Sequence, residues 1–328
     1  MSDPVFSVIL VNWNTASLLV EAVSSAFDDA ERSGIPIEVV VVDNGSTDDS
    51  VNRIRKEFPR AGVIENGRNL GFSRAVNRGL SVASGSHIIL LNTDARLVPG
   101  ALSVFRQTLE ENPRVGIIGG MLLDPDGSPQ NSYAPFPTLA TEVLNKSLLR
   151  LLFPGRYARK PDPHATALLP VDSIVGACFV IRRETVNDVG PLDERFFFFF
   201  EETDWCYQAR TKGWEVVVNP QVRITHGQGE SSKPVLVKSR IEFYRSRYRY
   251  FFKNCGVFQT GLLFAGLLIK NVVETVFAGF LCVVTLGRSA HWRRRFRVVA
   301  SLLLWHLLGC PKSWGLEGAL LGATPPKG

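Results

Sequence analysis

Short apolar runs alternate with amphipathic stretches between residues 7 and 91, and this alternation constrains the fold more than any other feature of the chain. The apolar runs, rich in β-branched residues, are Ser7–Val11, Glu38–Val42, Val63–Glu65 and His87–Leu91. Helical patterns lie between them, over Thr15–Phe27, Thr47–Phe58 and Ala75–Ala83. Continuous apolar strands joined by helices form parallel sheets that are covered on both faces. The sequence therefore predicts an α/β fold with a Rossmann-like, mostly parallel sheet.

Polar residues follow three of these strands at their carboxyl ends. Asn12 follows the first strand, Asp43 closes the second, and Asn92-Thr93-Asp94 closes the fourth. Each aspartate alone is most simply a turn former or a helix cap. However, ligands of open α/β sheets bind beyond the carboxyl ends of the strands. Three polar strand ends at one edge therefore predict a ligand site there.

A second acidic cluster, Glu201-Glu202-Thr203-Asp204, comes directly after the five phenylalanines Phe196–Phe200. It stands where a helix is predicted from about Asp204 to Lys212, so one carboxylate could cap that helix. Glu201 and Asp204 share a helical face, where they could bond backbone N–H groups or Arg210, whereas Glu202 points elsewhere. Glu202 is thus the carboxylate predicted to be free to act on a ligand, with Glu201 and Asp204 as alternatives. The phenylalanines predict a core strand or packed loop, with stacking of one ring on a ligand as the alternative.

The composition favours a folded protein of a reducing compartment. Of 328 residues, 45% are apolar and 21% are charged, which is typical of globular chains. Five cysteines, odd in number and never spaced as CxxC, argue against a disulfide framework or a zinc site. The first residues lack the basic and apolar segments of a signal peptide. We expect a protein that is made and kept in the cytosol.

The C-terminal part differs in composition, and the sequence predicts a domain boundary that leaves residues 1–235 as one domain and 236–328 as a helical, membrane-associated region. Between Lys238 and Arg297, basic residues far outnumber the two acidic ones, Glu242 and Glu274. An excess of this kind indicates an anionic partner. Because the basic residues alternate with a large apolar area, a membrane surface is favoured and nucleic acid is not.

Three uncharged stretches in this region, 254–269, 275–287 and 298–311, are each shorter than the roughly 20 residues that cross a bilayer. We expect helices that lie in the membrane interface or re-enter it, with arginines reaching lipid phosphates. A single spanning helix from Val257 to Leu286 is the alternative if Lys270 and Glu274, four residues apart, form a pair. A soluble helical domain or a dimer interface is the remaining interpretation.

Several motifs, in order, resemble those of the family 2 glycosyltransferases. They are Ser7–Asn14, Val42–Asp48, Asn69–Phe72 with Asn77–Gly79, Leu91–Asp94, Gly176–Arg183 and Phe200–Cys206. The resemblance spans roughly residues 5–230 and is nearest to the rhamnosyltransferase-like branch, which builds bacterial cell-wall, O-antigen or capsule glycans. It implies a GT-A fold.

The resemblance also implies roles for individual residues. The implied donor-binding residues are Val11, Asn12, Asp43, Arg68, Asn69, Asn92, Thr93 and Asp94. The implied acceptor-side residues are Gly176, Ala177, Cys178 and Trp205. Asp94, the last residue of a DxD-type motif, and His226 would bind a divalent metal. Asn92 stands where the family has its first aspartate, so Asp94 is the only carboxylate of the motif.

The implied chemistry agrees with these residue types. A divalent cation spreads the negative charge that builds up on a departing diphosphate. Mg²⁺ takes one or two protein carboxylates and leaves room for phosphate and water, while a histidine favours Mn²⁺. Attack by an acceptor hydroxyl needs a general base on the opposite face of the sugar, the role expected of Glu202.

We therefore expect a metal-dependent inverting glycosyltransferase at the cytoplasmic face of the inner membrane, as a peripheral or monotopic protein. It would move a sugar, for example L-rhamnose, from a dTDP- or UDP-linked donor to a polyprenyl-diphosphate-linked or glycan acceptor. A nucleotidyltransferase is an alternative, but Asn12–Thr15 is not a Gly-rich, basic triphosphate loop. A non-catalytic, membrane-bound sugar-nucleotide scaffold is another, against which Asp94, Glu202 and His226 argue.

Overall fold

The computed structural model of the chain describes residues 4–144, 149, 151, 166–227 and 236–317. Its Cα positions group into two compact units, and each unit combines separate segments of sequence. Unit 1 consists of residues 1–136, 161–196 and 201–231, and unit 2 consists of residues 137–160, 197–200 and 232–328. A single cut at residue 235 therefore does not separate the units, because two earlier segments belong with the C-terminal helices.

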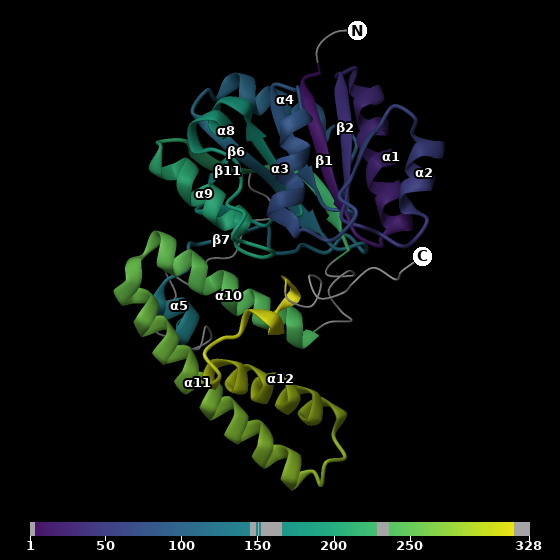
Figure 1. Ribbon diagram of the computed structural model, residues 1–328. Helices are drawn as coiled ribbons and strands as arrows, with labels where there is room; N and C mark the ends of the chain where they lie inside the picture. The colour runs from purple at the N-terminus through teal and green to yellow at the C-terminus, as the bar shows by residue number, and fades with distance from the viewer. Residues whose placement is uncertain (1–3, 145–148, 150, 152–165, 228–235, 318–328) are drawn as a thin grey trace. The chain divides into compact units, whose positions relative to one another are not determined.

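Unit 1 is built on a nine-stranded mixed sheet with the order β3-β2-β1-β4-β10-β6-β11-β5, and β8 pairs with β11 (Figure 1). The strands are β1 (Phe6–Asn12), β2 (Ile37–Asp43), β3 (Gly62–Glu65), β4 (His87–Leu91), β5 (Ala95–Leu97), β6 (Val115–Leu123), β8 (Leu169–Pro170), β10 (Cys178–Arg182) and β11 (Glu215–His226). A two-stranded sheet pairs β7 (Tyr133–Ala134) with β9 (Ser173–Ile174).

The first four strands of the sheet order are parallel to one another, as the apolar runs predict. The sheet becomes mixed at β10, which runs antiparallel between β4 and β6. β11 then runs parallel to β6 and antiparallel to β5. The predicted fold class, a mostly parallel α/β sheet covered by helices, is confirmed.

Helices cover both faces of this sheet (Figure 1). One face packs against α1 (Ala16–Ser33), α2 (Ser50–Glu57) and α4 (Ala101–Glu111). The other packs against α3 (Phe72–Val82), α8 (Arg183–Val189) and α9 (Glu201–Thr211). Two apolar clusters result, one on each side of the central strands, whose side chains are buried on both faces. The strands therefore read as continuous apolar runs rather than as alternating ones.

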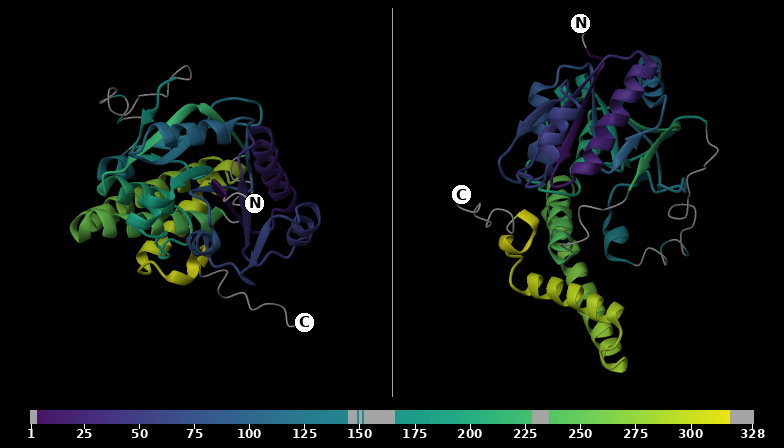
Figure 2. Two further views of the ribbon diagram at one scale, coloured as in Figure 1. Left: turned by 90° about the horizontal axis from the view of Figure 1, so that it is seen from above. Right: turned by 90° about the vertical axis from the view of Figure 1, so that its right-hand side faces the viewer.

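In unit 2, three helices pack against one another: α10 (Leu236–Asn254), α11 (Gly256–Val284) and α12 (Ala290–Leu307) (Figure 2). The short helix α5 (Leu139–Val143) packs on α11, and a 3-10 turn, η2 (Lys312–Trp314), follows α12. Beyond α5, residues 145–148, 150 and 152–165 lie outside the described part of the chain. The residues from 228 to 235, around the predicted boundary, lie outside it as well.

The helix α11 joins the first two predicted uncharged stretches into one element of 29 residues. By length and composition it is the one helix of the described residues that could cross a membrane. Only 17% of its most apolar window is buried. The pairing of Lys270 with Glu274, considered as the condition for a single spanning helix, does not form among the described residues: the Lys270 ammonium donates to the main-chain oxygen of Glu142 at 3.4 Å.

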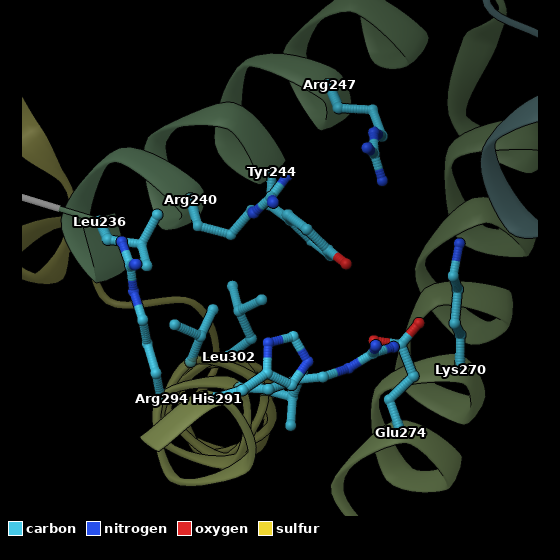
Figure 3. Close-up of a pocket in the computed structure, with 12 residues that line it drawn as sticks. Leu236, Arg240, Tyr244, Arg247, Lys270, Glu274, His291, Arg294 and Leu302 are labelled. Carbon is cyan, nitrogen blue, oxygen red and sulfur yellow. The ribbon is translucent and has the colours of Figure 1, made fainter. Parts of the chain in front are cut away.

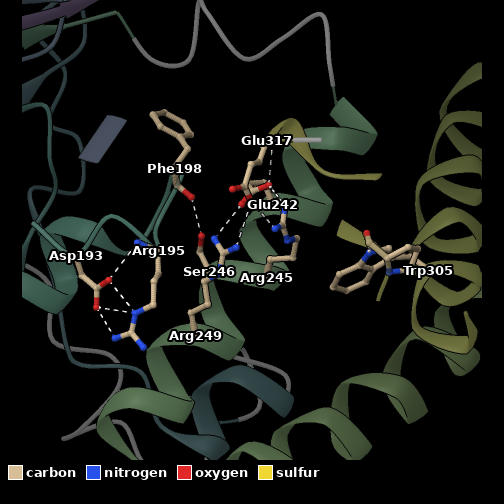
Figure 4. Close-up of polar contacts among 10 residues, drawn as sticks. Asp193, Arg195, Phe198, Glu242, Arg245, Ser246, Arg249, Trp305 and Glu317 are labelled. Atoms are coloured by element: carbon tan, nitrogen blue, oxygen red, sulfur yellow. Dashed lines mark hydrogen bonds and ion pairs between the residues drawn. The ribbon is translucent and has the colours of Figure 1, made fainter. Parts of the chain in front are cut away.

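Two polar features lie among the helices of unit 2. The helices α10, α11 and α12 line a pocket of about 460 Å³ (Figure 3). Separately, the fully buried Glu242 bonds Arg245 at 2.8 Å, and Glu317 bonds Arg245 at 2.6 Å and Arg249 at 3.3 Å (Figure 4). This network ties the chain beyond η2 to α10.

The phenylalanine run forms a packed loop and not a strand. Phe199 and Phe200 have φ angles of 73° and 71°, in the left-handed region that bulky side chains rarely adopt. Within unit 2, both rings contact Phe243, and the Ser246 hydroxyl donates to the main-chain oxygen of Phe198 at 2.8 Å (Figure 4). These contacts stabilise the loop in this backbone conformation, which otherwise costs about 1–3 kcal/mol per residue.

Candidate active site

The carboxyl ends of β1 and β2 are tied together by Asn12 and Asp43, which are register partners in the sheet. The Asn12 amide nitrogen donates to Asp43 Oδ1 at 2.8 Å and lies within bonding distance of the hydroxyls of Ser46 and Ser50. Asp43 Oδ2 accepts from the backbone N–H groups of Gly45, at 3.0 Å, and Ser46, at 2.9 Å. The loop after β2 is thereby closed around the aspartate, as its turn-type sequence predicts.

The same loop packs directly on the segment that carries Arg68 and Asn69. A β-carbon at Gly45, whose φ is +76°, would lie 2.6 Å from the Arg68 α-carbon, so only glycine permits this approach. Asn69 Oδ1 accepts from the Gly71 N–H at 2.9 Å, at the entrance to α3. Arg68 is exposed, and it lies beside the loop after β2, at the edge of the sheet that also holds Asp43.

The Asn92-Thr93-Asp94 turn joins β4 to β5 at the same edge of the sheet. Thr93 Oγ1 lies 3.0 Å from the Thr15 hydroxyl, which also donates to Asn12 Oδ1 at 2.8 Å. Thr15 stands at the N-cap of α1, as predicted, but its hydroxyl makes no capping bond. The three predicted strand ends are therefore linked by side-chain hydrogen bonds.

Asp94 and His226 are brought side by side by the pairing of β5 with β11, in which His226 is opposite Ala95. Asp94 Oδ1 lies 3.5 Å from His226 Nε2, and Gly227 N–H donates to the Asp94 main-chain oxygen at 2.8 Å. Both side chains keep only about a tenth of their surface exposed: 10% for Asp94 and 12% for His226.

Gln130 orients the His226 ring. Its amide nitrogen donates to Asp124 Oδ1 and to the His226 main-chain oxygen, both at 2.7 Å. Gln130 Oε1 therefore faces the ring, where it accepts from His226 Nδ1 at 2.9 Å. With the proton on Nδ1, the Nε2 lone pair points toward Asp94, the arrangement found for histidines that bind metals.

This donor set fits a divalent cation that completes its coordination with diphosphate and water. One carboxylate and one imidazole with a fixed tautomer are compatible with Mn²⁺, and with Mg²⁺ through the carboxylate. Within the described residues, no group of three or more His, Cys, Asp or Glu side chains forms a self-sufficient metal cage. Asn92 cannot add a carboxylate, and its N–H instead donates to the Ala177 main-chain oxygen at 3.0 Å.

That bond connects the Asn92-Thr93-Asp94 turn to the segment Gly176-Ala177, which precedes β10. On its other side this segment meets the start of α9, because a β-carbon at Gly176 would lie 3.5 Å from the carboxyl carbon of Glu202. The turn at Gly176 therefore lies between the Asp94 turn and Glu202. Candidate metal ligands and candidate base are thus joined by one short backbone segment.

The three acids of the cluster differ in environment. Helix α9 begins at Glu201, three residues earlier than predicted, so all three carboxylates stand in its first turn. Glu201 and Asp204 are buried, at 5% and 3% exposed, whereas Glu202 is half-buried. Burial raises the pKa of Glu202 above its ordinary value, although the backbone N–H groups of Glu202 and Thr203 oppose that shift. A carboxylate with a raised pKa holds a proton more readily, as a general base requires.

Three of the implied acceptor-side residues have buried side chains. Trp205 is 2% exposed, stacks on Phe179 and donates to the Gly190 main-chain oxygen, so its ring belongs to the core and not to an acceptor surface. Cys178 is 1% exposed, and burial raises the pKa of its thiol to about 12. Ala177 is 1% exposed as well.

Asn12, implied to bind the donor, is 0% exposed, and its side chain holds Asp43 and the loop after β2. Val11 is half-buried and packs with the core cluster beside β2. Arg210, considered as a partner of Glu201 and Asp204, bonds Asp172 and the Val171 main-chain oxygen.

Gln130 and Asp124, which hold the His226 ring, are not among the predicted site residues. Gln130 follows the turn Asp124–Gly127 at the end of β6, and nothing in that turn indicates a partner about a hundred residues later. Only the long-range pairing of β11 brings His226 to it, so no local pattern could have identified it.

The sheet order and the helices that cover it match the fold of solved GT-A glycosyltransferases. The fold matches the structure of GalNAc-T7 with UDP, GalNAc and Mn²⁺ at a TM-score of 0.55 and 18% identity, over 75% of this chain and 48% of that one. It also matches the mannosyltransferase PcManGT of Pyrobaculum calidifontis, in complex with GDP-Man and Mn²⁺, at a TM-score of 0.52 and 16% identity, over 94% of this chain and 88% of that one.

Residues 7–190 match the family described as Glycosyl transferase family 2, and the chain belongs to that family. It is 27% identical, over 246 residues, to the N-acetylglucosaminyl-diphospho-decaprenol L-rhamnosyltransferase of Mycobacterium tuberculosis, covering 71% of this chain and 78% of the relative. It is also 27% identical, over 253 residues, to the low-salt glycan biosynthesis hexosyltransferase Agl10 of Haloferax volcanii, covering 73% and 75%. The predicted family and its rhamnosyltransferase-like branch are confirmed.

Proposed function

We propose that this glycosyltransferase is a metal-dependent, inverting enzyme that transfers a sugar from a nucleoside-diphosphate donor to a lipid-linked acceptor. The observation that carries the proposal is the arrangement of Asp94 and His226 side by side, with Glu202 across the short Gly176-Ala177 segment. The sugar is proposed to be L-rhamnose from a dTDP-linked donor. That choice is supported by the named activity of the mycobacterial relative.

The donor is proposed to bind along the edge formed by β1, β2 and β4. Asp43 accepts two backbone hydrogen bonds through Oδ2, and its carboxylate keeps lone pairs that can accept from a pyrimidine N–H. Arg68, exposed beside the same loop, supplies a positive charge. Asp94 and His226 Nε2 would hold the cation, which neutralises the charge that develops on the departing diphosphate.

Glu202 is proposed to act as the base. Its carboxylate oxygen would take the proton from the acceptor hydroxyl as that oxygen attacks the anomeric carbon. A single attack opposite the diphosphate inverts the anomeric configuration, so no covalent sugar–enzyme intermediate is needed. Glu201 and Asp204, both buried, would hold the first turn of α9 in place.

The acceptor is proposed to be carried on a polyprenyl diphosphate, which would keep the enzyme at the cytoplasmic face of the inner membrane. Two observations support membrane association: the apolar helix α11, and the decaprenol-linked substrate in the name of the mycobacterial relative. In-plane or re-entrant helices remain our proposal for the C-terminal region.

Incubation of the full-length protein with a panel of dTDP-, UDP- and GDP-sugars, with Mn²⁺ or Mg²⁺, tests the proposal by nucleotide release. We expect release from one donor, loss of release in EDTA with recovery on added cation, and loss in Asp94→Ala. Asp126→Ala, which removes an exposed turn aspartate bonded to Ser128, is the control and should retain activity. Full turnover in excess EDTA would refute the metal, and no turnover with any donor would favour the scaffold.

A further inference from the structure

The pocket of unit 2 is strongly basic (Figure 3). Helix α10 contributes Arg240 and Arg247, helix α11 contributes Lys270, and helix α12 contributes Arg294 and Arg295. His291 also lines the pocket, and Glu274 is its one acidic lining residue. The Tyr244 hydroxyl points into the space between these side chains. Cationic groups from three helices thus converge on a cavity of about 460 Å³.

Most of this positive charge is not neutralised within the described part of the chain. Arg247 pairs with Glu142 at 2.8 Å. By contrast, no ion pair joins Arg240, Arg294 or Arg295 to a carboxylate of the described residues. Converging arginines without carboxylate partners form a site for an anion, and the planar guanidinium group suits phosphate oxygens.

The exposed surface of α11, the helix that also lines the pocket through Lys270 and Glu274, is apolar, which indicates what carries the anion. The exposed large side chains of α11 include Phe258, Leu262, Ile269, Val273, Val276 and Phe280, at 47–79% exposure. Successive members are three, four or seven residues apart, which places them on one side of the helix. A continuous exposed apolar face of this kind is rare on soluble proteins and marks contact with lipid or protein.

We propose that this pocket binds the phosphate head group of a membrane lipid whose hydrocarbon chains lie along the exposed face of α11. This inference rests on the membrane association in the proposed function, and it adds a defined lipid-binding site to that function. A lipid places a phosphate and an apolar chain next to each other, and the pocket and the face of α11 match that pairing. A lipid-linked diphosphate and an anionic phospholipid share this chemistry.

The test is a binding titration of the full-length protein in non-ionic detergent micelles. Three micelle preparations are compared: one without added lipid, one with undecaprenyl diphosphate and one with phosphatidylglycerol. Inorganic diphosphate is titrated separately. The pocket variant is Arg240→Gln/Arg294→Gln/Arg295→Gln. Each arginine near an anionic head group contributes about fivefold in affinity, so we expect the pocket variant to bind lipid phosphate roughly 100-fold more weakly.

The matched control removes the same charge from outside the pocket. It is Lys238→Gln/Arg288→Gln/Arg297→Gln. Lys238 lies in α10, Arg288 in the segment before α12 and Arg297 in α12; all three are exposed, and none lines the pocket. We expect it to bind within about threefold of the natural protein, because attraction by the diffuse surface charge is small in largely neutral micelles. Thermal unfolding of both variants confirms that each is folded.

Weaker binding in the pocket variant alone supports the inference, and the lipid that shows this loss identifies the source of the phosphate. Equal losses in both variants, or no loss in either, would overturn it. Inorganic diphosphate that binds as tightly as the lipid would overturn the lipid assignment. Donor turnover, measured on the same preparations, separates the two proposals: if the natural protein releases nucleotide but binds neither lipid, only the pocket proposal fails.

Discussion

Removing the hydrogen bond that orients His226 should weaken metal binding without destroying the catalytic machinery. In Gln130→Leu, a side chain of similar size replaces the amide, and three hydrogen bonds of 2.7–2.9 Å are lost. The bond to His226 Nδ1 fixes the tautomer, so its loss lets the ring proton occupy Nε2, the atom that faces Asp94. A proton there excludes a metal from that nitrogen.

The size of the effect follows from the role of the lost bond. One neutral hydrogen bond contributes about 0.5–1.5 kcal/mol, and loss of a residue that orients a metal ligand typically lowers metal affinity 10–100-fold. We therefore expect the Mn²⁺ concentration for half-maximal turnover to rise 10–100-fold, equivalent to about 1.4–2.7 kcal/mol. At saturating Mn²⁺, kcat should return to within about twofold of its natural value, since Asp94 and Glu202 are unchanged.

The assay is nucleotide release at graded Mn²⁺ concentrations, with thermal unfolding of the metal-free protein as a check on the fold. Gln107→Leu is the matched control, because Gln107 is an exposed glutamine of α4 whose amide bonds Glu111 at 2.7 Å. It should leave the Mn²⁺ dependence unchanged. A Gln130→Leu protein with an unchanged half-maximal Mn²⁺ concentration and a lower kcat at every concentration would refute the reasoning.

Three further changes have definite expected outcomes. Glu202→Gln should lower turnover 10²–10⁴-fold and raise the unfolding temperature at pH 7, because burial raises the pKa of Glu202 and disfavours its ionised form. Gly45→Ala should lower the free energy of unfolding by about 1–3 kcal/mol and abolish donor binding, because its β-carbon would meet the Arg68 backbone at 2.6 Å. Glu242→Gln should cost about 1–3 kcal/mol, measured by chemical unfolding, because it weakens the buried bond to Arg245, which keeps its ion pair with Glu317.

Each of these outcomes has a control. The extra stability of Glu202→Gln should disappear below the ordinary pKa of a glutamate, where both folded and unfolded states are protonated, and should grow with pH until the raised pKa is passed. Gly127→Ala, also at positive φ but with nothing within 4 Å, should leave donor binding intact. Glu110→Gln breaks an exposed pair with Arg106 and should cost less than about 0.5 kcal/mol. Equal costs at Glu242 and Glu110 would contradict the assigned burial effect.

Local sequence patterns were sufficient for the first half of unit 1. The run His87–Leu91 is a strand with those bounds, and the ends of β1, β2 and β4 meet at one edge, because parallel pairing aligns the carboxyl ends of neighbouring strands. The separate environments of Glu201 and Glu202 also follow the predicted helical geometry, though the helix begins at Glu201 itself.

What the sequence could not provide depends on contacts between distant segments. The Trp205 ring could stack on a sugar or pack in the core, because its ring nitrogen needs one acceptor in either place. Here the Gly190 main-chain oxygen is that acceptor and Phe179 stacks on the ring, so Trp205 packs in the core. Residues 197–200 group with the C-terminal helices through Phe243, a contact that no periodicity encodes. Gln130 likewise depends on how β11 registers beside β5 and β6.

The position of His226 at the last residue of β11 has a consequence for how the protein matures. Asp94 is synthesised early, but its partner arrives only after nearly all of unit 1 has left the ribosome and β11 has paired with β5. An incomplete chain therefore has half of the candidate ligand pair. If a cation binds both, it favours only the fully paired sheet, by about 2.7 kcal/mol at a hundred times its Kd. Cellular manganese or magnesium would then act as a check on completed synthesis, stabilising finished molecules over nascent or truncated ones.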